Sequence, residues 1–118
     1  HTRCGAVTAA IDLICSGETA NEATGCQHLD QIVEDIQQSI DPLTCRDLDR
    51  VATADKELFV DAVARRNVAR SVRTMLQQSQ TLSRLVRDGR VVVVGAMYNI
   101  VTGDIEFLTD TGTSQVLT

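Results

Sequence analysis

The sequence has few aromatic residues and no long apolar segment. Aromatic residues make up 3% of its 118 residues, with no tryptophan, so the core must be built from Val, Ile, Leu and Ala. No apolar run approaches the roughly 20 residues that span a bilayer. The sequence also lacks a glycine-rich nucleotide motif and a serine nucleophile elbow. These absences argue against a membrane-spanning helix. They also argue against the classes of nucleotide-binding protein and serine hydrolase that those motifs define.

The cysteines form no CxxC pair. The four are Cys4, Cys15, Cys26 and Cys45, widely spaced in a chain with long helical patterns. A disulfide framework is typical of small, loop-rich secreted domains, so we expect free thiols, one of them available as a metal ligand. Cys15 and Cys26 flank a polar loop and remain a possible pair in an oxidising compartment.

Composition favours one globular domain without a nucleic-acid partner. Hydrophobic residues make up 43% of the chain, enough for a core, and the net charge is -5 at neutral pH. A negative net charge argues against a phosphate-binding surface, although charge can be distributed unevenly along a chain.

Arg66, Arg70 and Arg73 form a basic stripe on the predicted long helix. The stripe could meet an acidic partner surface or an anion, but a solvated helix face is the usual explanation. Asp61 with Arg65 is expected to form a helical ion pair.

Helical periodicity dominates the first three quarters of the chain. Apolar spacing predicts helices over residues 5–15, 29–40 and 56–78, and a short helix after Ser79 that ends at Gly89. The segment SGETANEATG (16–25) is predicted to be a loop. The second helix should stop at Asp41-Pro42, and residues 43–55 stay ambiguous, with Thr44 and Asp47 compatible with a helix start.

The pattern changes to β-strands near the C-terminus. Four valines in succession (91–94) are typical of a strand covered on both faces. A turn at Thr102-Gly103 then leads to a return strand in which Ile105 and Phe107 alternate with acidic residues. One hairpin is marginal as a sheet by itself, so we expect its missing strands to come from sequence before His1 or from another chain.

The motif that could bind a metal ion is at the start of the chain. His1 and Cys4 offer an imidazole and a thiolate, both good zinc ligands. Cys4 would begin a helix, where the helix dipole favours a thiolate. By spacing alone this signal is weak. Cys26 and His28 could form a second metal pair, but packing at a helix start explains them better, and Cys15 is expected to be a small buried hydrophobe.

Four segments together resemble one family. The opening HTRCGAV (1–7) is similar to the second zinc motif of β-class carbonic anhydrases. Segments RRNV (65–68), LVRDG (85–89) and GAMYNIVTG (95–103) resemble the same family, in the same order and with similar separations.

This resemblance implies an α/β fold in which helices flank a mostly parallel sheet, with residues 1–118 as the C-terminal portion of a single domain. It implies one zinc ion per subunit, carbon dioxide and bicarbonate as substrates, and a homodimer or larger homo-oligomer. His1 and Cys4 would be two ligands of a four-coordinate site. The family's first cysteine ligand and its Asp-Arg pair would precede His1, so we assign no catalytic residue in this chain.

The sequence also leads to expectations about activity, self-association and location. The 118-residue chain alone should have negligible carbonic anhydrase activity and bind zinc weakly, because only two family ligands are present. It should self-associate through the hairpin of residues 91–108 and the helix near Gly5. We expect a cytoplasmic location, with the periplasm left open, and no membrane or nucleic-acid partner. The alternative to an enzyme is a non-catalytic assembly module with the same fold.

Overall fold

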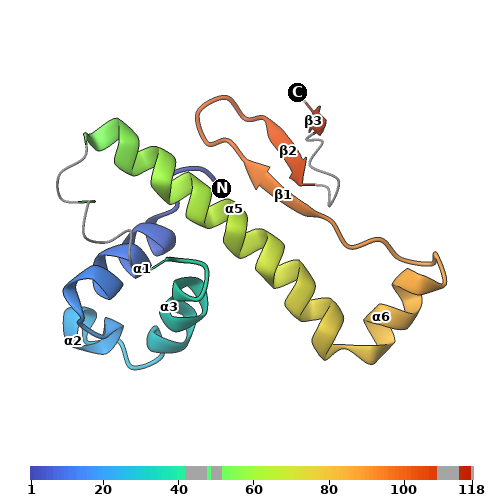
Figure 1. The fold of residues 1–118 in the computed structure, drawn as a ribbon, viewed down its shortest axis with the longest axis horizontal. Helices are drawn as coiled ribbons and strands as arrows, with labels where there is room; N and C mark the ends of the chain where they lie inside the picture. Colours follow the sequence, from blue (N-terminus) through green and yellow to red (C-terminus); the bar gives the residue numbers. More distant parts are fainter. Residues whose placement is uncertain (42–47, 49–51, 109–114, 118) are drawn as a thin grey trace. The chain divides into compact units, whose positions relative to one another are not determined.

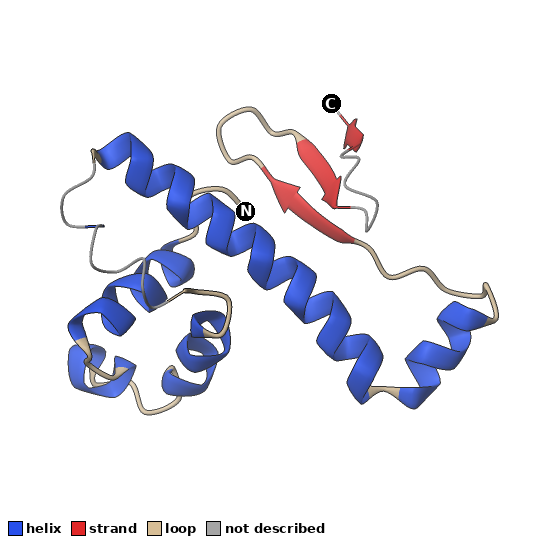
Figure 2. Cartoon of the chain, viewed as in Figure 1, coloured by secondary structure: helices blue, strands red, loops and turns tan. Residues whose placement is uncertain are grey.

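A computed structural model describes residues 1–41, 48, 52–108 and 115–117. Its elements are helices followed by a small sheet (Figures 1 and 2). The chain divides into two compact units, Thr2–Ala64 and Arg65–Thr118, and His1 is grouped with the second. Each unit is described by itself below.

The first unit packs short helices around an aliphatic core. It contains α1 (Gly5–Ser16), α2 (Ala20–Thr24), α3 (Asp30–Gln37) and the first part of α5 (Thr53–Gln78). The sequence prediction of an aliphatic core is confirmed, because the buried hydrophobic residues of this unit are Val7, Ala10, Ile11, Leu13, Ala20, Ile36, Ile40, Val60, Val63 and Ala64. Helices α1 and α3 pack together, and the Gln37 side-chain amide donates to the Ala10 carbonyl at 3.2 Å.

The segment predicted as a loop contains helix α2. The Thr19 hydroxyl accepts the Glu22 backbone N–H at 3.1 Å, and the Glu22 carboxylate accepts the Thr19 backbone N–H at 2.8 Å. This reciprocal capping box begins a helix that is too short to show apolar periodicity. The glycines expected to bound the loop do form turns, since Gly17 and Gly25 end α1 and α2 with φ of 77° and 73°.

The other helices match the predicted positions with shifted ends. Helix α3 is shorter than the predicted 29–40, because turns replace the helix after Gln37. Helix α5 begins at Thr53, three residues earlier than predicted, and ends at Gln78 as predicted. The expected Ser79 cap of α6 (Gln80–Arg87) is confirmed by a 3.2 Å bond from the Leu82 N–H to its hydroxyl. The ambiguous helix start at Thr44 and Asp47 lies outside the described residues.

The second unit carries a three-stranded antiparallel sheet. Strands β1 (Gly95–Tyr98), β2 (Ile105–Leu108) and β3 (Gln115–Leu117) lie in the order β1-β2-β3. Their register pairs Gly95 with Leu108 and Tyr98 with Ile105. The predicted hairpin is therefore confirmed, and the mixture of helices and strands agrees with an α/β class. All pairings among the described residues are antiparallel, so the parallel part of the expected sheet stays a prediction.

The four valines before β1 do not form the predicted strand. Residues 91–94 have no strand assignment, and Val92 is 79% exposed. The four valines predict a strand from composition, but a strand needs a neighbour to pair its backbone groups. Within the described residues no strand pairs with this segment. The prediction of a covered strand is therefore wrong for this chain by itself.

Glycine at position 95 allows β1 to lie close to α5. A Cβ atom built on Gly95 would lie 2.6 Å from Val68 Cγ1, shorter than any normal contact. Valine is stiff in a helix, so Val68 has little freedom to move aside. The second unit also has an ion pair between Arg65 of α5 and Glu106 of β2. Both contacts fix the sheet against the second part of α5.

Candidate metal centre

Cys4 begins helix α1, as the sequence predicted. Its backbone is extended (φ -65°, ψ 118°), and its side chain makes no capping hydrogen bond. The Cys4 carbonyl instead accepts the Thr8 backbone N–H at 2.9 Å and the Thr8 hydroxyl at 3.1 Å. The thiol is free and half-buried. The sulfur is therefore available for a ligand at a helix N-terminus, where the dipole favours negative charge.

Arg3 gives the opening turn an unusual backbone conformation. Its φ is +52°, a left-handed value that costs a non-glycine residue free energy. The Arg3 N–H donates to Asp61 Oδ1 at 2.7 Å, and its guanidinium Nη2 lies 3.1 Å from Glu57 Oε2. Both carboxylates belong to the first part of α5. We call this set of Arg3, Glu57 and Asp61 the Arg3 clamp.

Sequence reasoning missed this clamp. It had paired Asp61 with Arg65, four residues along the same helix. In the structure Asp61 accepts the Arg3 N–H, and Arg65 forms an ion pair with Glu106 on β2. A contact across 58 residues leaves no periodic signal in the sequence. The presence of carboxylates at Glu57 and Asp61, on one face of α5 four residues apart, was the available hint.

His1 is exposed and is grouped by its contacts with the second unit, whereas Cys4 belongs to the first. Within the described ranges no group of three or more His, Cys, Asp or Glu side chains could hold a metal ion. The described residues therefore contain no complete metal site, and the assignment of His1 and Cys4 as ligands stays a prediction.

The sequence model of the carbonic anhydrase family matches residues 1–105. The chain belongs to the β-class carbonic anhydrase family. The match covers all four segments that carried the resemblance, at residues 1–7, 65–68, 85–89 and 95–103. Comparisons with curated proteins and with solved structures gave no match.

The donor types of this carbonic anhydrase chain fit zinc, but their number does not complete a site. Imidazole nitrogen and cysteine thiolate are usual zinc ligands, and a catalytic site has three protein ligands with an open fourth position. The described residues hold no group of three such donors. The structure shows a free Cys4 thiol on a residue whose backbone carbonyl accepts hydrogen bonds from Thr8.

The remaining thiols and His28 form no second metal centre in the part that the structure describes. Cys26 and His28 are exposed, and Cys26 is a free thiol, so the alternative Cys15–Cys26 pair does not form. Cys15 is exposed and disulfide-bonded, which corrects the expectation of a buried free thiol. Cys45 lies outside the described residues.

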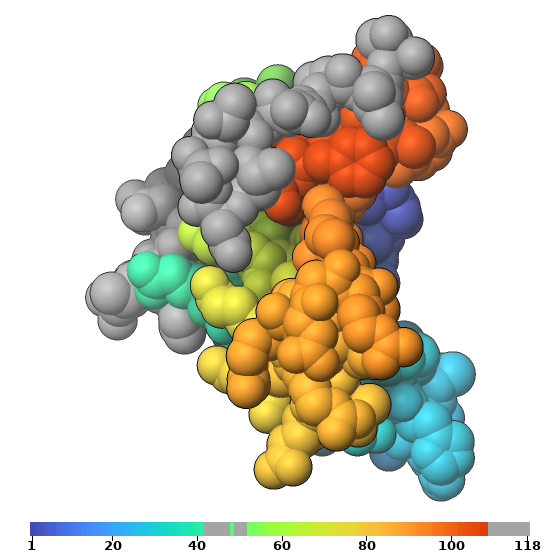
Figure 3. Space-filling model, turned by 90° about the vertical axis from the view of Figure 1, so that its right-hand side faces the viewer, coloured from blue at the N-terminus to red at the C-terminus, as the bar shows by residue number. Residues whose placement is uncertain are grey.

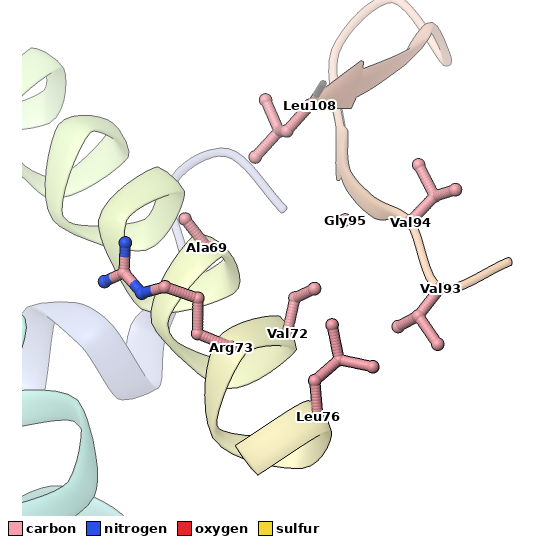
Figure 4. A pocket seen from close by; sticks show the side chains of 8 residues that line it. All are labelled: Ala69, Val72, Arg73, Leu76, Val93, Val94, Gly95 and Leu108. Atoms are coloured by element: carbon pink, nitrogen blue, oxygen red, sulfur yellow. The ribbon is translucent and has the colours of Figure 1, made fainter. Parts of the chain in front are cut away.

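An apolar groove lies in the second unit of this chain. It encloses about 220 Å³ and is lined by Ala69, Val72, Arg73, Leu76, Val93, Val94, Gly95 and Leu108. Figure 4 shows Val72 and Leu76 pointing from α5 towards the strand segment, whereas the Arg73 guanidinium lies back along the helix. The groove therefore offers mainly apolar surface, with Arg73 as the charged residue of its lining.

Proposed function

We propose that the protein containing this chain catalyses the reversible hydration of carbon dioxide to bicarbonate, with zinc held in part by His1 and Cys4. The observation that carries this proposal is the family match over residues 1–105, which includes both donors. When bound in such a site, zinc lowers the pKa of a coordinated water to about 7 and so supplies hydroxide at neutral pH.

Under this proposal, residues of this chain position the Cys4 thiol. Cys4 presents a free thiol from the N-cap position of α1. The Arg3 clamp orients the turn that carries it, because the Arg3 N–H is fixed to the Asp61 carboxylate. Further ligands have to come from outside the described residues. Carbon dioxide and bicarbonate are the substrates under this proposal, and a homo-oligomer is the assembly.

The experiment compares the protein from its native source with the 118-residue chain. Zinc content is measured by elemental analysis, and cobalt is substituted so that thiolate-to-metal charge-transfer bands report on Cys4. We expect one metal ion per native chain, bands that vanish in Cys4→Ser, and stopped-flow hydration that vanishes with them. The 118-residue chain should hydrate carbon dioxide at a negligible rate. A native protein that keeps its bands after Cys4→Ser contradicts the assignment.

A second candidate function is a non-catalytic assembly module. It is favoured by one observation: large apolar side chains are exposed along residues 91–105, including Val92 at 79% and Val101 at 68%. Such a surface is typical of protein contacts. Analytical ultracentrifugation of the chain and of a Val92→Ser, Val94→Ser variant tests this role, with association expected in the first and reduced in the second. Zinc-dependent hydration by the native protein would reject the module.

A further inference from the structure

The end of α5 and helix α6 form a polar cleft that belongs to neither the metal motif nor the apolar groove. It encloses about 540 Å³. Its lining residues all have polar or charged side chains: Gln77, Gln80, Thr81, Ser83, Arg84 and Arg87. None of them is acidic, aromatic or aliphatic. Figure 3 shows α6 in yellow and orange on the face turned towards the viewer.

The two guanidinium groups of this cleft are not neutralised within the described part of the chain. Arg84 and Arg87 are exposed, and no ion pair or side-chain hydrogen bond forms at either. Asp88 follows directly and caps α6, but it pairs with neither arginine among the described residues. Side chains three positions apart on a helix have Cβ atoms about 5–6 Å apart, so the guanidinium groups of Arg84 and Arg87 can both reach one anion.

The surrounding charge favours an anion here in an otherwise acidic chain. Residues 65–90 contain seven arginines and one aspartate, whereas the rest of the sequence has four basic and 15 acidic residues. A cluster of one sign raises the local concentration of opposite charges. The net charge of -5 therefore conceals a basic segment, and the sequence-based argument against a phosphate-binding surface does not hold for it.

The cleft is shaped by a fixed turn between the two helices. The Ser83 hydroxyl donates to the Leu76 carbonyl across the helix junction, and the Ser79 hydroxyl caps α6. Gln77 at the end of α5 and Gln80 at the start of α6 consequently lie on the same cleft. Their amides, and the Thr81 hydroxyl, make no side-chain hydrogen bond with described residues, and each can both donate and accept.

We propose that this cleft binds a phosphate monoester with a hydroxylated body, of the sugar phosphate class. Two arginine forks match the charge and geometry of a phosphate dianion. The glutamine amides and Thr81 suit sugar hydroxyls. The lining has no aromatic ring to stack a nucleobase and no aliphatic side chain for an acyl chain. Its volume lies within the range of roughly 300–1,000 Å³ for small-molecule sites, larger than inorganic phosphate needs.

The test uses three probes on the full 118-residue chain: glucose 6-phosphate, inorganic phosphate and glucose. Titration calorimetry gives the affinities, and NMR follows the side-chain amides of Gln77 and Gln80. We expect glucose 6-phosphate to bind more tightly than inorganic phosphate and glucose not to bind. Failure of both phosphates to bind at millimolar concentration, or equal binding of the two, would overturn the proposal.

Matched variants locate the site. Arg84→Gln and Arg87→Gln should each weaken glucose 6-phosphate binding about tenfold, the usual effect of removing a charge-assisted hydrogen bond. Arg66→Gln removes the same charge from an exposed arginine of α5 outside the cleft, so it should leave the affinity within about twofold. An equal loss in Arg66→Gln rejects the cleft. Arg84→Lys keeps the helix-end charge and the fold, and should still lose affinity because it lacks the fork.

Discussion

The two units of the chain differ in how they bury apolar surface. Of the eleven buried hydrophobic residues among the described ones, ten lie in Thr2–Ala64, and Met97 is the one in the second unit. The exposed large hydrophobics have the opposite distribution: eight of eleven lie in the second unit, most of them between Val91 and Ile105. Among the described residues, the first unit therefore holds most of the buried apolar side chains, whereas the second holds most of the exposed large ones.

The largest expected effect comes from the core of the first unit. Ile11→Ala removes a side chain with 0% exposure and should lower the free energy of unfolding by about 2–5 kcal/mol. Val92→Ala changes a residue of similar type at 79% exposure and should cost less than about 0.5 kcal/mol. Urea unfolding at low protein concentration measures both. Equal costs would contradict the contrast between the units.

Gly95→Ala tests whether the second unit is also packed where its sheet meets α5. The added Cβ would lie 2.6 Å from Val68 Cγ1, so we expect a loss of about 1–3 kcal/mol in the free energy of unfolding. Gly5→Ala is the control, because a Cβ at Gly5 has no atom within 4 Å. Val68→Ala in the Gly95→Ala background should recover part of the loss. A harmless Gly95→Ala would show that the sheet moves freely on this helix.

Asp61→Ala tests the Arg3 clamp. It leaves the Arg3 N–H without its carboxylate and should lower the free energy of unfolding by about 1–1.5 kcal/mol, the lower end for hydrogen bonds to charged groups, because this bond is exposed to solvent. Glu57→Ala should cost less than about 1 kcal/mol, because the Arg3 and Glu57 side chains are 53% and 45% exposed.

The same variants have a second readout at the metal motif. In a Cys26→Ser background, iodoacetamide should modify Cys4 faster after Asp61→Ala than after Glu57→Ala, because the turn before Cys4 loses its main tether. Unchanged Cys4 reactivity in both variants would show that the clamp stabilises the fold without positioning the thiol.

The smallest expected effect concerns the capping box of α2. The backbone N–H of Thr19, and then its hydroxyl, lower the pKa of the Glu22 carboxyl below its ordinary 4.5. A lowered pKa in the folded state means that this stabilisation is present above the unfolded-state value and is lost as the pH falls through the folded value. In Thr19→Ala the pKa of Glu22 should rise part of the way towards 4.5. Carboxyl NMR titration measures the pKa of Glu22, with Thr81→Ala as the control variant. An unchanged pKa in Thr19→Ala would show that the Thr19 hydroxyl does not lower it.

Most of the helical architecture was predictable because apolar spacing determines it. The long helix, the Ser79 cap and the turn at Gly103 were identified from local patterns, and the structure confirms them. The missed helix α2 depends on the Thr19 and Glu22 side chains and on no apolar period. Its signal was a threonine followed three residues later by a glutamate.

The errors about strands and contacts have a different physical cause. Residues 91–94 have the composition of a covered strand, but a strand forms only where another strand completes its hydrogen bonds, and composition does not report that. For the candidate site, the position of Cys4 at a helix start was predictable from the motif. The hydrogen bond from the neighbouring Arg3 to Asp61 was not predictable, because Arg3 and Asp61 meet only through tertiary folding.

The left-handed turn at Arg3 has a consequence for anyone who transplants this motif into a designed protein. A four-residue His-x-x-Cys graft would carry the two donors but not the carboxylate that keeps the intervening backbone in place. The portable unit is therefore the motif together with an acidic residue on a neighbouring helix. A designer who lacks that helix would do better to place glycine at the third position, where a positive φ needs no external support.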